Sequence, residues 1–140
     1  MSVDNHDAVL DAMVESLSAY LPERYVERSL ADPAMLTTQQ RQAGFICVVA
    51  GSGGEFANYR GREADLGSMK VTLVGFLEVA EGSAKVAIER AELALLGDCL
   101  RWLSTVRVPG LDVVYPDTWK LSQQLEHPFG WVSLSLEVRP

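Results

Sequence analysis

The sequence lacks several features that mark whole classes of protein. None of its apolar runs approaches the roughly 20 residues that a helix needs to cross a bilayer, which argues against a membrane-spanning chain. No basic cluster exceeds an isolated arginine pair, and the 140 residues carry a formal net charge of -7. Because nucleic-acid readers normally carry a clustered Lys/Arg footprint, nucleic acid is not expected as a partner.

Cysteine and histidine are equally scarce, with two residues of each. Cys47 lies in a strand-like run and Cys99 on the apolar face of a helical pattern, so both are predicted to be small buried side chains rather than a disulfide. His6 falls on a helical stripe and His127 precedes a proline, so they build no local metal site. We therefore expect no metal, no cofactor and no catalytic nucleophile.

The stretch AGSGGEFANYRGREADLG, residues 50–67, begins like a phosphate-binding loop because glycines follow the apolar run 45–49. A phosphate loop needs Lys and then Ser or Thr after its last glycine, and here Glu55 and Phe56 follow. A dinucleotide-binding loop needs a helix at this point, whereas these residues lead into a strand. The stretch is interpreted as a long flexible loop at 51–67, either without a role or reaching another subunit.

Hydrophobic periodicity predicts a single α+β domain over residues 1–140. Apolar spacings of three and four indicate one helix over 6–21 and a longer helix over about 84–103, with Ser83 as its N-cap. Alternating patterns predict strands at 25–30, 45–50, 69–79, 111–115, about 121–125 and 132–139, with a turn at Pro116-Asp117. This order favours a mostly antiparallel β-sheet of four to six strands with two main α-helices packed on one face.

The longer helix carries more apolar surface than one sheet can cover. Packing on a sheet needs a stripe about 100° wide, and here two rows together span more than half of the circumference. We expect this helix to meet the sheet and also either the first helix or another chain. The two rows are Ile88, Ala91, Leu95, Cys99 and Trp102, and Leu93, Leu96, Leu100 and Leu103.

Charged residues in two places are candidates for subunit contacts. Asp7, Asp11 and Glu15 recur every four residues along the first helix, so three like charges share one ridge. The ridge is either a solvated surface or a surface that accepts arginines from a neighbouring copy. Such arginines are available in the 51–67 loop, whose candidate contact residues are Tyr59, Arg60, Arg62 and Glu63.

The order of elements resembles the tail terminator, or tail completion, proteins of long-tailed bacteriophages and prophages, including the lambda-type minor tail protein. The resemblance spans nearly the whole chain and lies in pattern rather than in a catalytic motif. It rests on the amphipathic opening helix, the run GREADLGSMKVTLVGFLEV, the helix AKVAIERAELALLGDCLRWL, and the closing SQQLEHPFGWVSLSLEVR.

This resemblance implies a non-enzymatic α+β subunit of a homohexameric ring. Such a ring caps the polymerised tail tube and offers a surface to the head-completion proteins, so the expected partners are other copies, the tube protein and those proteins. The acidic, polar opening residues do not look like a secretory signal, so we expect a cytoplasmic product. The resemblance implies the host cytoplasm during assembly and then the virion tail. Alternatives are another neck or baseplate adaptor, or a small cytoplasmic ligand-binding domain or enzyme.

Overall fold

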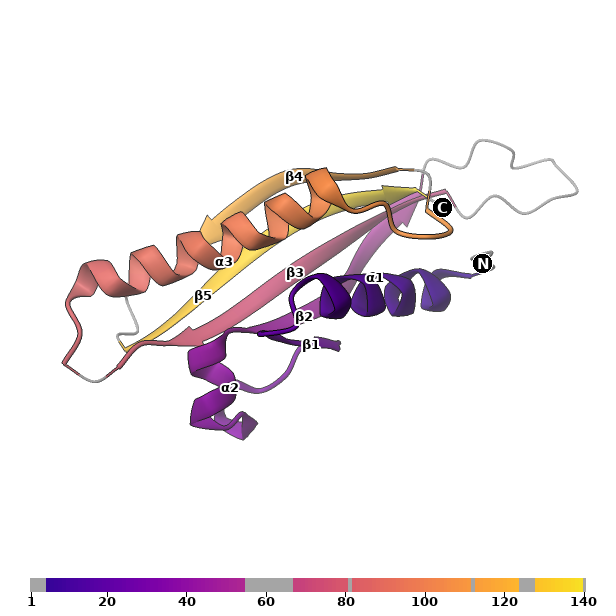
Figure 1. The fold of residues 1–140 in the computed structure, drawn as a ribbon. Helices are drawn as coiled ribbons and strands as arrows, with labels where there is room; N and C mark the ends of the chain where they lie inside the picture. The colour runs from indigo at the N-terminus through magenta and orange to yellow at the C-terminus, as the bar shows by residue number, and fades with distance from the viewer. Residues whose placement is uncertain (1–4, 55–66, 81, 112, 124–127, 140) are drawn as a thin grey trace, which may run out of the picture.

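The computed structural model describes residues 5–54, 67–80, 82–111, 113–123 and 128–139, which are the described residues below. Figure 1 shows their helices and strands. In chain order these are α1 (His6–Tyr20), β1 (Tyr25–Arg28), the 3-10 turn η1 (Pro33–Met35), α2 (Thr38–Ala43), β2 (Phe45–Gly54), β3 (Ser68–Glu78), α3 (Lys85–Thr105), β4 (Val113–Leu121) and β5 (Phe129–Arg139).

The five strands form one sheet in the order β1-β2-β3-β5-β4. β1 runs parallel to β2, and the other three neighbouring pairs are antiparallel. The two long helices, α1 and α3, lie on the same face of this sheet (Figure 1). The predicted α+β class, with a mostly antiparallel sheet and two main helices on one face, is therefore confirmed.

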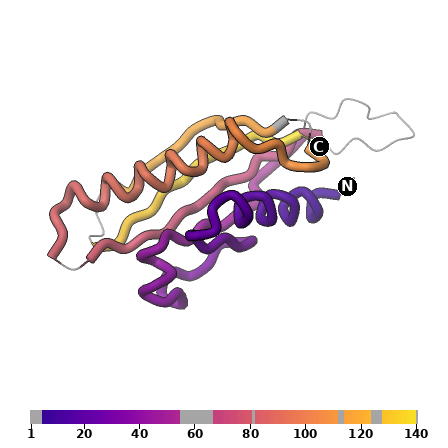
Figure 2. The backbone as a smooth tube through the Cα atoms, viewed as in Figure 1, coloured from indigo at the N-terminus to yellow at the C-terminus, as the bar shows by residue number. Residues whose placement is uncertain are grey.

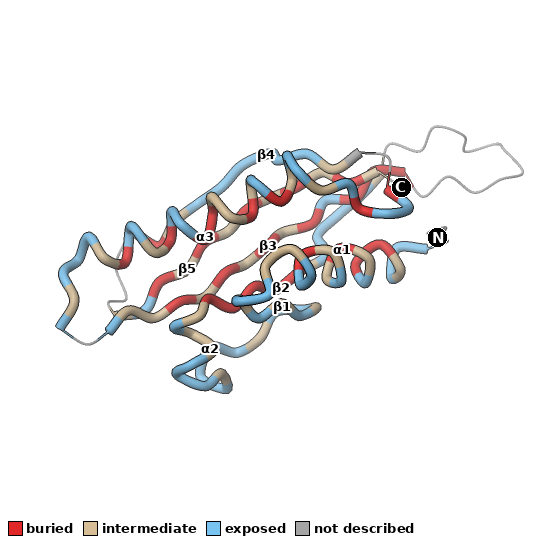
Figure 3. Tube along the Cα trace, viewed as in Figure 1, coloured by how far each residue is buried: buried red, intermediate tan, exposed pale blue. Residues whose placement is uncertain are grey.

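The hydrophobic core lies between this sheet face and the two long helices. Every second residue of β3 and β5 is buried there, and the intervening side chains are partly exposed on the other face (Figure 3). Val71, Leu73, Leu134 and Leu136 show the pattern, with 2% exposure or less. The two-residue period of a half-covered strand thus places these side chains inward, as the sequence predicts.

α3 covers the β5 and β4 side of the sheet with unequal burial of its two leucine-rich rows. Ile88, Leu95, Cys99 and Trp102 are buried, but Leu93 in the second row is 44% exposed. A bond from the Trp102 indole Nε1 to the Ser16 hydroxyl, 2.9 Å long, joins α3 to α1. The first row therefore meets the sheet and α1. Most of the second row is covered too, because Leu96 is 4% exposed and Leu100 and Leu103 pack against the core, so Leu93 is its exposed member.

The glycines of residues 51–54 belong to a strand rather than to the loop predicted at 51–67. β2 continues to Gly54 with a register shift between Ala50 and Gly53, so the loop was predicted to start too early. A Cβ at Gly53 would lie 2.6 Å from the Ser68 carbonyl oxygen, which explains a glycine at this bulge. Residues 55–66 lie outside the described residues.

Pro116 and Asp117 do not form the predicted turn. β4 runs through both of them as one strand, with a register shift between Pro116 and Thr118 against β5. A proline is tolerated here because β4 is the edge strand and a bulge relieves its missing donor. The separate strand predicted near 121–125 is not formed at Ser122 and Gln123, since β4 ends at Leu121, and residues 124–125 lie outside the described residues.

Two helix starts differ in how well the sequence predicts them. Ala84, not Ser83, is the N-cap of α3, and no side chain caps that end. Thr37 caps α2 through a reciprocal pair of bonds with Gln40, as its T-x-x-Q spacing allows. His6, expected on the apolar stripe of α1, is exposed at its first turn.

Several elements converge at one end of the molecule. Figure 2 shows the start of α1 and the end of β5 there. The paired ends of β2 and β3 lie at the same end, because Gly54 pairs with Ser68 and Met69 pairs with Val138.

Candidate interaction surfaces

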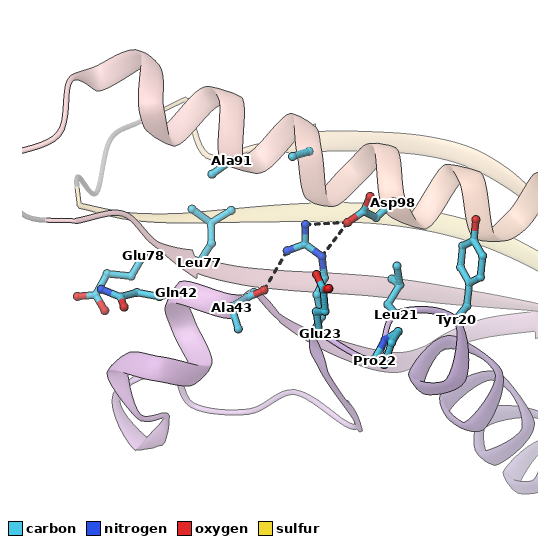
Figure 4. Close-up of a pocket in the computed structure, with 13 residues that line it drawn as sticks. Tyr20, Leu21, Pro22, Glu23, Gln42, Ala43, Leu77, Glu78, Ala91 and Asp98 are labelled. Carbon is cyan, nitrogen blue, oxygen red and sulfur yellow. Dashed lines mark hydrogen bonds and ion pairs between the residues drawn. The ribbon is translucent and has the colours of Figure 1, made fainter.

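A cleft of about 610 Å³ lies between α3 and the segments that follow α1 and α2. Figure 4 shows Ala91 and Asp98 on its α3 side, with Pro22 and Ala43 across from them. Because the side chain of Ala91 is small, it leaves space in the cleft beside α3. Its volume exceeds that of the groove beside α1, which is about 470 Å³.

Two charged groups of this cleft, Arg24 and Asp98, bind each other. Arg24 contacts the Asp98 carboxylate through Nε at 2.9 Å and Nη2 at 2.8 Å, and its Nη1 donates to the Ala43 carbonyl at 3.1 Å. Arg101 donates to the second Asp98 oxygen. The guanidinium of Arg24 therefore ties α3 to the α1–β1 and α2–β2 connections, which is a structural use of its charge.

Arg41 fastens α2 to the sheet at the far side of the cleft. Its Nε lies 3.3 Å from Glu78 of β3, and its guanidinium lies 5.6 Å from the centre of the Phe129 ring. The same side chain donates to the carbonyls of Pro33 and Leu36. One residue thus holds η1, α2, β3 and β5 together, and a lysine could not reproduce this fork.

The three acidic residues of the α1 ridge, Asp7, Asp11 and Glu15, have two different environments. Arg28 of β1 donates to Asp7 at 2.7 Å and to Asp11 at 3.0 Å. The hydrogen bond to Asp7, followed by that to Asp11, raises the pKa of the Arg28 guanidinium. Glu15 lies outside this group and lines a different groove. Two of the three predicted contact residues therefore engage an arginine of their own chain.

The other predicted contact residues, Tyr59, Arg60, Arg62 and Glu63, lie outside the described residues. Their role in binding another subunit stays a prediction.

A second groove, of about 470 Å³, separates α1 from the segment that follows α3. Ala12 and Ala19 of α1 form one side, and Val106 and Pro109 form the other. Its lining is mainly apolar, although Glu15 and Arg107 also contribute. The small side chains of α1 leave space for this groove, whereas the buried residues of α1 pack into the core.

The edge strand β4 presents large aromatic side chains to solvent. Trp119 is 52% exposed and Tyr115 is 45% exposed, and residues 115–120 are exposed throughout. In register, Trp119 is opposite Leu134, so it lies on the helix-bearing face of the sheet. Tyr115 is opposite Glu137 in register, so it lies on the other face of the sheet, and Leu93 on α3 is a further exposed apolar side chain.

A buried carboxylate, Glu92, clamps the ends of β4 and β5. Its Oε2 accepts from the backbone N–H of Ser122 at 3.2 Å and of Trp131 at 3.0 Å. Glu92 is 1% exposed, and its Oε1 has no partner among the described residues. The sequence reasoning missed this residue, although an acid one turn after Ile88 in an apolar row was an available signal.

Both cysteines are buried free thiols, as their positions predicted. Burial raises the pKa of Cys99 to about 12 and also raises the pKa of Cys47. The Cys47 sulfur accepts a weak bond from the Ala31 N–H at 3.4 Å. Within the described residues, no group of three or more His, Cys, Asp and Glu side chains could hold a metal ion.

Comparison with protein-family models and with curated proteins gives no match for this chain. Among the described residues, no helix combines the length and the apolarity that spanning a membrane requires.

Proposed function

We propose that this chain is a non-enzymatic virion assembly protein, a tail terminator of a long-tailed bacteriophage or prophage. Its copies form a ring, a homohexamer in the proposal, that caps the tail tube and joins it to the head-completion proteins. The protein would act in the host cytoplasm during assembly and remain in the virion tail. The sequence resemblance supplies this class, and the α+β architecture is the one that the resemblance implies.

The observation that carries the proposal is the exposure of large apolar side chains on α3 and β4. Trp119 and Leu93 remain exposed after the chain has folded, although one complete sheet face and two helices are available to cover apolar groups. Large apolar side chains left exposed on a folded protein mark a protein contact where they gather into one patch. An assembly protein uses such surface when neighbouring subunits arrive.

The cleft between α3 and the segments that follow α1 and α2 also fits an assembly role. Its Arg24 and Asp98 are bound to each other, and Arg41 is bound to Glu78. These pairs hold helices on the sheet, so these four charged groups serve the shape of the subunit.

The decisive test is electron microscopy of phage tails produced with the gene deleted. We expect tails of uncontrolled length without attached heads, and a supplied wild-type copy should restore uniform tails. Tails of normal length in the deletion would contradict the proposal.

A pull-down with purified tail-tube subunits separates the terminator from another neck or baseplate adaptor. The terminator should bind assembled tubes directly and at their ends. Binding only to head-side or baseplate components would assign the chain to one of those adaptors.

A further inference from the structure

Residues 29–43, which include η1 and α2 and are called the strap below, lie on the sheet face opposite to α1 and α3. The register shows which face this is, because Cys47 of β2 is opposite Val74, whose side chain is on the partly exposed face of β3. The Ala31 N–H donates to the Cys47 sulfur at 3.4 Å, and α2 packs beside β3. The strap therefore covers part of the face that the two long helices leave open.

Two fully buried side chains on this face do not belong to the main core. Phe45 is 1% exposed and Cys47 is 0% exposed, yet neither is part of the core cluster between the sheet and the long helices. Phe45 stacks on Tyr25 of β1, with 6.4 Å between the ring centres, and is opposite Phe76 in register. Phe76 is opposite Trp131, so a row of aromatic residues crosses four strands on the face that carries the strap.

The strap shields other residues but is not itself buried. Neither η1 nor α2 has a buried residue, and the strap adds no side chain to the core cluster (Figure 3). It is held by polar contacts: Arg41 lies 3.3 Å from Glu78 and over the Phe129 ring, and Arg24 donates to the Ala43 carbonyl. Release of the strap therefore breaks these contacts without opening the main core.

We propose that the strap opens as a unit while the sheet, α1 and α3 stay folded, and that opening uncovers Phe45 in the aromatic row. Segments with few buried apolar contacts open at a lower free energy than the core does. Opening exposes Cys47 but leaves Cys99 in the core cluster, so the two free thiols report two different events. The motion is independent of the proposed role in tail assembly, because every group that it needs belongs to one chain.

The test is pulse labelling of the full folded chain with iodoacetamide, with each modified cysteine identified by mass spectrometry. Each rate is divided by the rate of the same cysteine in the denatured chain. Cys47 should react at least about 10-fold faster than Cys99 on this scale. Its rate should also depend less steeply on urea, because opening the strap exposes less surface than unfolding. Equal rates with equal urea dependence would overturn the proposal.

A strap variant tests the contacts that hold the closed state. Arg41→Ala removes contacts that exist only when the strap is closed, so it should raise the Cys47 rate about 10-fold or more. Gln39→Ala is the matched control, since Gln39 is an exposed residue of the same helix, and should change this rate by less than about 2-fold. A Cys47 rate that Arg41→Ala leaves unchanged would contradict the proposal.

A core variant separates opening of the strap from global unfolding. Ile88 of α3 is fully buried in the core, and its contacts persist when the strap opens. Ile88→Ala should therefore raise the Cys99 rate about 30-fold or more and leave the Cys47 rate within about 2-fold of wild type. Ile88→Val makes the same comparison with a smaller effect if Ile88→Ala does not fold. Equal acceleration of both thiols would show that Cys47 is reached only by global unfolding, and the proposal would be wrong.

Discussion

Glu92 is a buried charge-bearing residue whose side chain connects a helix to the ends of two strands. Its carboxylate accepts two backbone N–H groups that would otherwise lose a partner in a water-excluded site. A Cβ at Gly130 would lie 3.0 Å from the Glu92 Oε2, so the glycine leaves room for the carboxylate to reach the strands. The clamp therefore depends on both residues.

Glu92→Ala should lower the free energy of unfolding by about 2–5 kcal/mol, because it removes the carboxylate that accepts from the Ser122 and Trp131 N–H groups and opens a cavity. Urea denaturation measures the change. Glu89→Ala is the control one turn earlier on the same helix, where the side chain is exposed, and should shift stability by less than about 0.5 kcal/mol. Equal effects of the two variants would contradict the assigned clamp.

Because of the Cys99 thiol, the free energy of unfolding should fall as the pH rises in the alkaline range. Burial raises its pKa from 9.0 to about 12, so the unfolded thiol ionises first as the pH rises. The contribution is complete below pH 9 and is lost between pH 9 and 12, with a slope of up to about 1.4 kcal/mol per pH unit. Cys99→Ala should show a shallower decline in urea denaturation measured across this range. Parallel declines for both proteins would rule out the Cys99 contribution.

At the scale of the elements, replacing Gly97 of α3 or Gly75 of β3 by alanine should change the free energy of unfolding in opposite directions. Gly97 is inside α3, and a Cβ there would meet only Arg101 Nη1 at 3.5 Å. Gly97→Ala should raise the free energy of unfolding by about 0.5–1 kcal/mol, because glycine is a poor helix former.

Gly75 in β3 faces α3, and a Cβ there would lie 2.7 Å from Leu95 Cδ2. Leu95 is 2% exposed and cannot move aside cheaply. Gly75→Ala should therefore lower the free energy of unfolding by about 1–3 kcal/mol. Thermal and urea unfolding check both signs, and stabilisation by Gly75→Ala would mean that α3 sits farther from β3.

At the scale of the whole molecule, the pair Arg24 and Asp98 joins the N-terminal part of the chain to α3. The side chains are only 18% and 23% exposed, and their contacts are short. A double-mutant cycle with Arg24→Ala and Asp98→Ala should give a coupling energy of about 1–3 kcal/mol, since charged hydrogen bonds are strong when partly buried.

The exposed pair Arg28 and Asp11 provides the matched comparison. Asp11 is 63% exposed, so solvent screens this interaction. A cycle with Arg28→Ala and Asp11→Ala should therefore give a smaller coupling energy than the Arg24–Asp98 cycle. A larger coupling for the exposed pair would show that the contacts of Arg24 are not what holds α3 in place.

Much of the element pattern was predictable because it depends on local periodicity. The alternation in β5 and the three-and-four spacing in α1 predict both element type and buried face. The bulge at Pro116 was not predictable in the same way, since Pro-Asp also starts turns and only pairing with β5 distinguishes the two. The candidate surfaces were predicted less well: Glu15 was selected, but Trp119 and Glu92 were not.

The sequence by itself determined the α+β class, the buried faces of the long elements and the burial of both cysteines, because hydrophobic patterning acts between residues that are near neighbours along the chain. Only the tertiary structure decided the strand order, which brings Arg28 to Asp7 and Asp11 and leaves Glu15 beside a groove. It also placed β4 at the edge, which exposes Trp119. These outcomes depend on contacts between segments distant in sequence, and no local spacing encodes them.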